Sequence, residues 1–272
     1  MTDYNVLANG DLFPIQPGME AASISYVEKV VEWNPITQNA AIFYQLQTKE
    51  KNNQKTWLVP DGCMDFVFCC SPTKSSATIL GKKFKSRCIE MECGSTYFGV
   101  RPFSEHGLMI NGISMKEIAN DVIPFLEMFP DEDIVETITQ AESFEQRISS
   151  FRTYIKKKIN EQEAKIDLGH YCFLQICASK GTLKMEGLVE KSGYSDRYLR
   201  KKFEESFGIP PKKFGQIVMF QNSLNKLMKQ KNSKLDIVFE NGYYDQAHLN
   251  HQFKKLVNVP PSEFKNIICG IS

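Results

Sequence analysis

Short apolar or alternating runs follow one another along the first part of the chain, up to residue 100. Gly, Pro, Asn and Lys residues separate them, and such residues favour turns. The runs are Ala40–Thr48, Thr56–Val59, Asp65–Cys70, Ala77–Leu80 and Ser95–Val100. Several short strands at this spacing predict a small antiparallel β-barrel or sandwich over residues 1–130.

After residue 130 the apolar positions change to a helical period. A stripe with spacings of three and four runs through Ile134–Asn160 and consists of Ile148, Phe151, Ile155 and Ile159. This stripe could pack on the barrel or pair with the same stripe of a second copy, which would make a homodimer. We therefore expect a helical linker over residues 131–165, closed by the polar and flexible run Glu161–Asp167.

Near the C-terminal end the chain repeats itself. Leu188–Phe214 and Ile237–Phe264 share a Gly-Tyr pair, a leucine and a phenylalanine four apart, and a Pro-Pro pair followed by an aromatic residue. Matching positions lie 49 residues apart at the Gly-Tyr pair and 50 apart afterwards, so the second copy carries one extra residue. Two diverged copies of this unit predict two helix–turn–helix motifs within residues 166–272, and hence an all-α module that reads DNA.

The first copy predicts a recognition helix with a basic outer face. Gly193 ends the preceding helix, and Ser195 is a good N-cap for the next one. Tyr198, Leu199 and Phe203 supply the buried stripe of that helix. The candidate DNA contacts are Ser195, Arg197, Arg200 and Lys201, and Lys202, Lys212 and Lys213 are candidates for phosphate. Arginine and lysine suit guanine edges and phosphates, and the alternative is a merely solvated helix face.

The second copy has the same skeleton with a polar rather than a basic outer face. Gly242 makes the turn, Tyr244 or Asp245 caps the recognition helix, and Leu249 and Phe253 face inward. The outward positions proposed to contact DNA are Gln246, His248, Asn250 and His251. Gln and Asn side chains can make paired hydrogen bonds to adenine, so this helix is expected to read bases with less electrostatic attraction.

The charges divide the chain in the same way. The whole protein carries a net charge of +1, with 17 basic and 22 acidic residues up to Lys165 (17 − 22 = −5) and 16 basic and 10 acidic after it (16 − 10 = +6). A moderately basic C-terminal part is consistent with phosphate contacts and salt-dependent binding to DNA.

On these residues the C-terminal part resembles the AraC/XylS family of bacterial transcription regulators. The matching stretches are Gly193–Phe203, Gly242–Leu249 and Val259–Phe264, together with Phe253. The resemblance implies two subdomains bridged by a long helix near Lys212–Lys229, with recognition helices in successive major-groove segments of a DNA operator. An activator is expected, with RNA polymerase as a candidate partner, and a repressor is the open alternative. The resemblance adds weight to the homodimer.

Two stretches of the N-terminal part resemble a cupin-like sensor-type domain. They are the Pro-Asp-Gly-Cys-x-Asp signature within Trp57–Asp65 and the Gly-Val-Arg segment within Phe98–Phe103. Such a domain implies a small-molecule effector, and the candidate contacts are Trp57, Asp61, Asp65, Phe98 and Arg101. An arginine near aromatic rings suits a carboxylate or phosphate. The alternative is a turn at Asp61-Gly62 and a structural ion pair of Arg101, for which Glu105 is a partner.

Cysteine and histidine usage bears on cofactors and on enzyme chemistry. The chain has eight cysteines without a C-x-x-C motif and four histidines, of which His106 is the first, so we expect no metal and no cofactor. The alternative to a regulator is an enzyme–regulator fusion with a reactive cysteine such as Cys63 or Cys69, although no histidine lies near either in sequence. No apolar run approaches the roughly 20 residues of a membrane span, and no signal peptide is evident, so a cytoplasmic protein with reduced thiols is expected.

Overall fold

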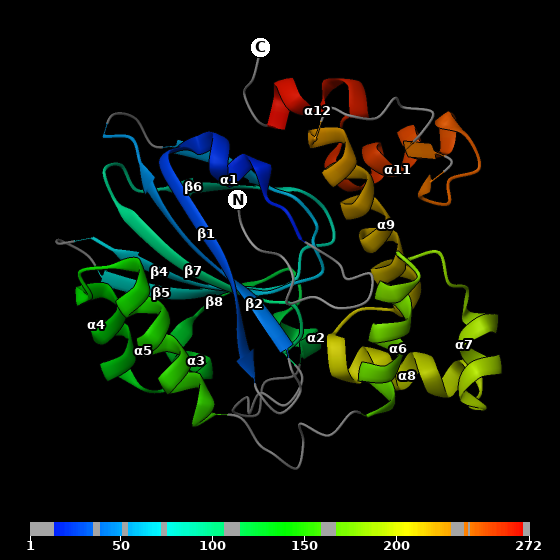
Figure 1. Ribbon diagram of the computed structural model, residues 1–272, viewed down its shortest axis with the longest axis horizontal. Helices are drawn as coiled ribbons and strands as arrows, with labels where there is room; N and C mark the ends of the chain where they lie inside the picture. Colours follow the sequence, from blue (N-terminus) through cyan, green and yellow to red (C-terminus); the bar gives the residue numbers. More distant parts are fainter. Residues whose placement is uncertain are drawn as a thin grey trace.

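The chain combines a β-rich N-terminal part with an all-helical C-terminal module, as expected for an α+β protein. The computed structural model describes residues 14–34, 39–50, 54–71, 75–105, 115–158, 167–229, 237–238 and 240–268. Figure 1 shows the sheet and the helices that cover it on one side and the C-terminal helices on the other. His106, Ile159 and Glu161–Ile166 lie outside the described residues.

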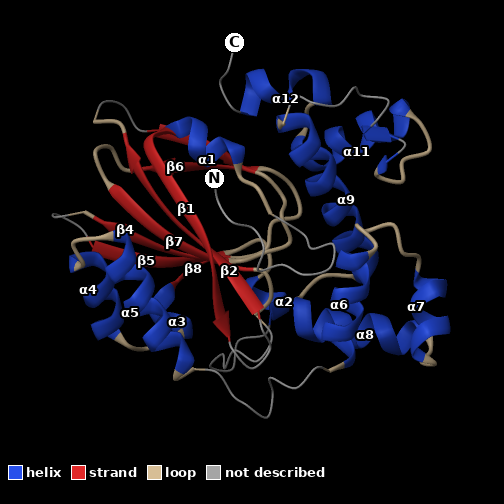
Figure 2. Ribbon diagram, viewed as in Figure 1, coloured by secondary structure: helices blue, strands red, loops and turns tan. Residues whose placement is uncertain are grey.

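The N-terminal part is an open sandwich rather than a closed barrel. Six antiparallel strands form the main sheet, in the order β1 (Ser23–Asn34), β2 (Asn39–Thr48), β7 (Thr96–Pro102), β4 (Asp65–Cys70), β5 (Ser75–Leu80) and β8 (Val122–Pro124). A two-stranded sheet of β3 (Gln54–Leu58) and β6 (Arg87–Met91) stands apart from it. The short helix α1 (Pro17–Ala22) packs on β3. Figure 2 separates these strands from the surrounding helices.

Alternation along the strands gives the main sheet one strongly aromatic face. Phe66 lies opposite Val100 and Phe68 opposite Phe98 in the register of β4 and β7, and all four side chains are buried. Because side chains alternate along a strand, such pairs lie on the same face. The short helices α2 (Met115–Ile118) and α3 (Phe125–Met128), with α4 (Glu132–Gln140) and α5 (Phe144–Lys156), contribute the rest of this core.

Helix α5 uses the predicted apolar stripe within the chain. Ser143 and Gln146 form a capping box at its start, and Ile148, Phe151 and Ile155 are buried. The ring of Phe151 lies between 5.5 and 6.1 Å from the rings of Phe43, Phe66 and Phe68. The stripe therefore packs on the sheet, and pairing with a second copy through these three residues is wrong, because their surface is already covered. The described part of the expected linker, which forms α4 and α5, is therefore part of the N-terminal core.

The C-terminal module has two cores joined by one long helix. Its helices are α6 (Leu168–Ala178), α7 (Met185–Ser192), α8 (Asp196–Phe207), α9 (Pro211–Met228), α11 (Gln246–Val257) and α12 (Pro261–Ile268). Pro211 occupies the first turn of α9, where its missing N–H is no loss. Phe214 and Ile217 of α9 belong to the first core, whereas Phe220 and Leu224 belong to the second. The predicted bridging helix Lys212–Lys229 is thus confirmed within one residue at each end.

The N-terminal part packs directly against α9. The side chain of Gln221 is fully buried; its Nε2 donates to the carbonyl oxygen of Pro60 at 2.7 Å, and its Oε1 accepts from the amide of Ile15 at 2.9 Å. Val59 is buried in the second core of the module, and a Cβ at Gly62 would lie 2.7 Å from the ring of Phe214. Both halves of α9 therefore contact the turn that follows β3.

Candidate nucleic-acid interface and effector region

The first helix–turn–helix is built as the sequence predicts. Gly193 ends α7 in the left-handed conformation with φ of 73°, and the side chain of Ser195 accepts a hydrogen bond from the amide of Tyr198. Leu199 and Phe203 are buried in the first core. There the ring of Phe203 stacks on the ring of Phe207. The recognition helix α8 is therefore fixed at its start by a cap and along its inner side by aromatic packing.

The outer face of α8 presents the predicted basic side chains. Arg197 and Lys201 are exposed, and Arg197 forms no salt bridge within the described part of the chain. The Nε of Arg200 lies 2.7 Å from a carboxylate oxygen of Asp196, one turn earlier. Exposed pairs of this kind contribute about 0–1 kcal/mol, so Arg200 can exchange its partner for a phosphate or a base at little cost.

Two of the predictions for basic and aromatic residues need correction. Tyr198 is not part of the buried stripe: its side chain is 42% exposed, and its ring lies 5.4 Å from that of Tyr194. The reason is geometric, since neighbouring positions of a helix point about 100° apart and Leu199 takes the inward direction. Lys213 is less available for phosphate than expected, because its Nζ lies 3.9 Å above the ring of Phe84, and burial lowers its pKa.

The second helix–turn–helix also keeps its predicted turn and cap. Gly242 has φ of 74°, and the side chain of Asp245, not that of Tyr244, accepts a hydrogen bond from the amide of His248 at 2.7 Å. The extra residue of this copy therefore lies between the glycine and the cap. It allows Tyr243 to turn inward and accept a hydrogen bond from Ser223 of α9 at 3.1 Å.

The outer face of α11 is more varied than the sequence suggests. Gln246 and His251 are exposed, and Asn250 is half-buried. His248 is also half-buried, because its ring lies 5.3 Å from that of Tyr243 and 5.5 Å from that of Tyr244. The imidazole of His248 therefore packs against the tyrosines of the turn, and it is less exposed to solvent than the side chain of Gln246.

Sequence reasoning missed three exposed tyrosines beside the recognition helices. Tyr194 and Tyr244 each precede an N-cap residue directly, and their side chains are 49% and 84% exposed. Tyr198 stands on the first turn of α8. The signal was present in the repeat, because an aromatic residue stands directly before the cap in both copies, at Tyr194 and Tyr244. Tyrosine hydroxyls are among the groups that contact DNA phosphates.

The effector candidates Asp61, Asp65 and Arg101 come together as a buried ion cluster. The Nε of Arg101 lies 2.8 Å from Asp65 Oδ1 and 3.2 Å from Asp61 Oδ2, and all three side chains are at most 1% exposed. Neither oxygen lies along the Nε–H bond, so the contact is ionic in character. Burial acts to lower the pKa of Arg101, but the charges of Asp65 and Asp61 outweigh it and hold the pKa above its ordinary value.

This cluster agrees with the structural alternative, with one correction to its partners. Glu105, expected opposite Arg101, instead forms an ion pair with Lys82 at 2.9 Å. Asp65 lies next to Arg101 because Phe66 pairs with Val100 in antiparallel strands. The residue before Phe66 is therefore beside the residue after Val100. Since the charge of Arg101 and those of Asp61 and Asp65 are paired inside the protein, a ligand carboxylate would have to displace one of these partners.

The five effector candidates do not line one common space. Phe98 is buried among the rings beneath α3 and α5, and Trp57 packs against the second core of the C-terminal module. Phe98 and Arg101 are three residues apart on β7, so alternation turns them to opposite faces of the sheet. The structure therefore does not bring these five candidates together around one effector.

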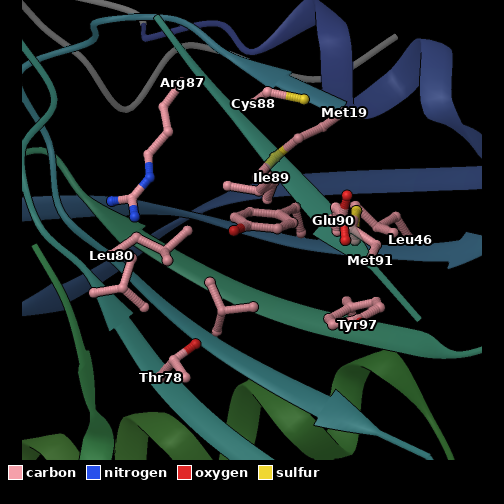
Figure 3. Close-up of a pocket in the computed structure, with 13 residues that line it drawn as sticks. Met19, Leu46, Thr78, Leu80, Arg87, Cys88, Ile89, Glu90, Met91 and Tyr97 are labelled. Carbon is pink, nitrogen blue, oxygen red and sulfur yellow. The ribbon is translucent and has the colours of Figure 1, made fainter. Parts of the chain in front are cut away.

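A cavity that sequence reasoning missed lies between the two sheets. Figure 3 shows its lining side chains from β2, β4, β5, β6 and β7, and its volume is about 340 Å³. The lining residues are Met19, Tyr44, Leu46, Val67, Thr78, Leu80, Arg87, Cys88, Ile89, Glu90, Met91, Tyr97 and Val122. This size falls at the lower end of small-molecule sites, about 300–1,000 Å³, and the lining is mainly apolar with a few polar groups. The side chains of Tyr44, Leu46 and Val67 occupy alternate positions to the aromatic core residues, which is the signal that could have found it.

The cysteines and acidic groups of the described ranges do not gather into a metal-binding arrangement. Cys63 is fully buried, and burial raises the pKa of its thiol well above the ordinary value. Burial also raises the pKa of Cys69. No group of three or more His, Cys, Asp or Glu residues converges there as metal ligands would. Among the helices described, none has the length and apolar character needed to cross a membrane.

Comparison with known proteins identifies the C-terminal module. Residues 188–267, which span both capped recognition helices, match a family described as a helix-turn-helix domain. The module is an AraC-type helix-turn-helix domain. In this AraC-type domain the match begins in α7 and ends in α12, so it includes α9, which bridges the two cores. No curated protein matches the chain.

Three solved structures that are similar over most of the chain are forms of ToxT from Vibrio cholerae. The apo K231A variant of strain SCE256 is 15% identical, with 84% of this chain and 97% of that chain covered and a TM-score of 0.46. Wild-type ToxT of that strain bound to an unsaturated fatty acid is 16% identical, with 85% and 96% covered and a TM-score of 0.42. ToxT of V. cholerae O395 bound to (E)-4-(8-methylnaphthalen-1-yl)but-3-enoic acid is 15% identical, with 88% and 98% covered and a TM-score of 0.43.

Proposed function

We propose that this protein is a sequence-specific transcription regulator that reads DNA with α8 and α11. The observation that carries the proposal is the pair of capped helices, each with a buried inner stripe and an exposed polar face, on the one bridging helix α9. In this proposal Arg197, Arg200 and Lys201 contact guanine edges and phosphates from α8. Gln246, Asn250 and His251 contact base edges from α11, and His248 positions the turn.

The same proposal assigns a different role to the N-terminal part. A small-molecule effector would bind in the cavity between the two sheets rather than at Arg101, because the cavity offers space and the ion cluster does not. An effector changes DNA binding only if it binds the competent and incompetent arrangements with different affinity. The effector and its sign of regulation, including the predicted activation through RNA polymerase, stay predictions.

Cellular location, oligomeric state and enzyme chemistry each bear on this proposal. A protein that acts on a bacterial operator works in the cytoplasm, so this location follows from the proposed function. A homodimer would need a surface other than Ile148, Phe151 and Ile155 of α5, since these are covered by the sheet. An enzyme–regulator fusion receives no support, because Cys63 is buried and its thiol pKa is raised.

The proposal is tested by selecting bound sequences from a random pool of duplex DNA with the full-length protein. The expected result is a site with two blocks of preferred bases, about one helical turn apart. Arg197→Ala should abolish the preference in one block, and Gln246→Ala in the other, at a cost of about 1–3 kcal/mol each at the affected base pair. Arg152→Ala, an exposed arginine on α5, is the matched control and should change neither block.

The outcome that contradicts the proposal is specific. If Arg197→Ala and Arg152→Ala select the same site with the same affinity, α8 does not read bases. A uniform loss on all sequences with Arg197→Ala would assign this residue to phosphate instead. Absence of any selected site for the full-length protein, with folding verified, would overturn sequence-specific reading by the chain as it stands.

A further inference from the structure

One short segment joins the cavity to both halves of the DNA-binding module. Gly81–Ser86 connects β5 to β6, and the residues on either side of it, Leu80 and Arg87, line the cavity. Gly81 donates its N–H to the carbonyl oxygen of Asp121 at 2.9 Å, and a Cβ at Gly81 would collide with the carbonyl oxygen of Ile118. The start of the segment is therefore anchored on the N-terminal part.

Lys82 reaches from this segment to the end of the first recognition helix. Its Nζ donates to the carbonyl oxygen of Phe207 at 3.2 Å and lies 4.8 Å from the centre of the Phe207 ring. Phe207 is the last residue of α8, and its carbonyl is one of those that a helix leaves without an internal partner. A cation is favourable at this negative end of the helix dipole. The buried ion pair with Glu105 holds the ammonium in place.

The other end of the segment reaches the second recognition helix. The N–H of Ser86 donates to the carbonyl oxygen of Leu256 at 2.7 Å, in the last turn of α11. Between Lys82 and Ser86, the ring of Phe84 packs against the first core and lies under Nζ of Lys213, on α9. The segment Gly81–Ser86 thus contacts the last turn of α8 through Lys82, α9 through Phe84 and the last turn of α11 through Ser86.

We propose that Gly81–Ser86 is a clamp that fixes both recognition helices relative to each other and moves them together when the cavity is filled. Two helices that read one operator must keep a separation of about one turn of DNA, roughly 34 Å. A segment that contacts the ends of both helices is therefore placed to change DNA affinity without contacting DNA. The regulatory consequence rests on the proposed function, whereas the mechanical coupling is a property of the folded chain.

Amide hydrogen exchange without DNA tests the mechanical coupling. The amides of Gly208 and Asn258 close the last turns of α8 and α11 by donating to Glu204 and Lys254, so their exchange reports on those turns. The variant is Lys82→Met with Glu105→Gln, which removes both members of the buried ion pair together. The control is Lys85→Met, the same substitution at an exposed position of the same segment.

The expected result is faster exchange at both reporter amides in the paired variant, by about tenfold, which corresponds to loss of a hydrogen bond to a charged group. The control should match the wild type. Of the two recognition helices, Lys82 hydrogen-bonds to α8, whereas the contact to α11 is made by Ser86, so faster exchange at Asn258 is the decisive observation. If only Gly208 changes, or if neither changes, the segment does not act as one clamp. Phe84→Ala supplies a second variant with the same expectation, should the paired variant fail to fold.

Filling the cavity tests whether it is connected to the clamp. Val67 is half-buried on β4 and lines the cavity, so Val67→Phe adds a ring there. We expect this variant to change the exchange rates of the Gly208 and Asn258 amides together, both faster or both slower than in the wild type. We also expect it to change the Kd for a selected DNA site. Both shifts should shrink when Lys82→Met and Glu105→Gln are added. Independent effects of the two changes would overturn the connection.

The two proposals fail in different ways. If the full-length protein selects no DNA site but the exchange results are as expected, the proposed function is wrong and the clamp stands. If DNA reading is as proposed but Lys82→Met with Glu105→Gln exchanges like Lys85→Met, the clamp is wrong and the DNA reader stands.

Discussion

At the scale of single residues, the clearest feature is the fully buried arginine between two carboxylates. Arg101 lies on β7, Asp65 on the neighbouring β4, and Asp61 in the turn before it. The sequence indicates that these residue types occur close together, but not that they are each other's partners. The pairing depends on the register of β4 with β7, which is set by the aromatic face of the sheet and not by local spacing.

Removing the arginine should destabilise the protein strongly. Arg101→Met leaves the carboxylates of Asp61 and Asp65 buried without their main counter-charge, and such a change costs about 3–5 kcal/mol. Asp61→Asn and Asp65→Asn, added to Arg101→Met, should restore part of that loss. Urea unfolding measures the free energies, with Arg152→Met as an exposed control. A loss below 1 kcal/mol for Arg101→Met would show that the cluster is not held as described.

The cysteines should differ sharply in their reaction with N-ethylmaleimide near neutral pH. Cys88 is exposed, whereas Cys63 is fully buried and burial raises its thiol pKa. Because the thiolate is the reactive form, Cys63 should be labelled only after unfolding, at a rate that follows the unfolding rate. Mass spectrometry of peptic peptides gives both rates. Rapid labelling of Cys63 in the native protein would revive the reactive-cysteine hypothesis.

At the scale of helices and strands, patterns of hydrophobicity predict most elements of the C-terminal module and fewer of the N-terminal part. The caps at Ser195 and Asp245 and the glycine turns are local signals, so they can be read from the sequence. The strand β1 was missed, because this edge strand carries polar and apolar residues on both faces. β6 was missed because it is short and charged. Alternation along β2 and β4 indicates which side chains point away from the aromatic core, but the enclosure of the cavity depends on how the two sheets face each other.

The two turn glycines provide a matched pair of tests. Both Gly193 and Gly242 have positive φ, so an alanine costs about 1–2 kcal/mol at either position. A Cβ at Gly193 meets nothing within 4 Å, whereas one at Gly242 would lie 2.6 Å from Cγ2 of Thr182. Gly242→Ala should therefore lower the free energy of unfolding more than Gly193→Ala. Thermal and urea unfolding compare them, and equal losses would contradict the close contact.

The packing of α5 on the sheet gives a third stability test. Phe151 is fully buried among three phenylalanine rings, so Phe151→Ala should cost about 3–5 kcal/mol. Arg152→Ala, its exposed neighbour, should change the free energy of unfolding by less than about 0.5 kcal/mol. If Phe151→Ala were as stable as Arg152→Ala and changed the oligomeric state instead, α5 would belong to a subunit interface.

At the scale of the whole molecule, charge is separated between the two parts although the chain is nearly neutral. The basic C-terminal module presents Arg197 and Lys201 to solvent. In the N-terminal part, by contrast, the carboxylates of Asp65 and Glu105 form buried ion pairs. Affinity for DNA should therefore depend on salt through a small number of phosphate contacts.

Salt dependence should separate phosphate contacts from base contacts. Lys212 is exposed at the start of α9, so Lys212→Gln should weaken binding to all sequences alike and reduce the slope of log K against log salt by about 1. Arg197→Ala should instead change the preferred bases. Fluorescence anisotropy over a salt series measures the slopes. An unchanged slope with Lys212→Gln would exclude this lysine from the phosphate contacts.

The burial of Gln221 and Val59 has a consequence for how such a protein can evolve. The second core of the DNA-binding module includes Val59 from the β-rich part, and the side chain of Gln221 forms its hydrogen bonds in the described structure with backbone groups of that part. A recombination event that attached a different N-terminal half would leave an apolar hollow and an unpaired amide on α9. Exchange of the N-terminal part alone should therefore lower the stability of the DNA-binding module, whereas point changes on the exposed faces of α8 and α11 leave this junction intact.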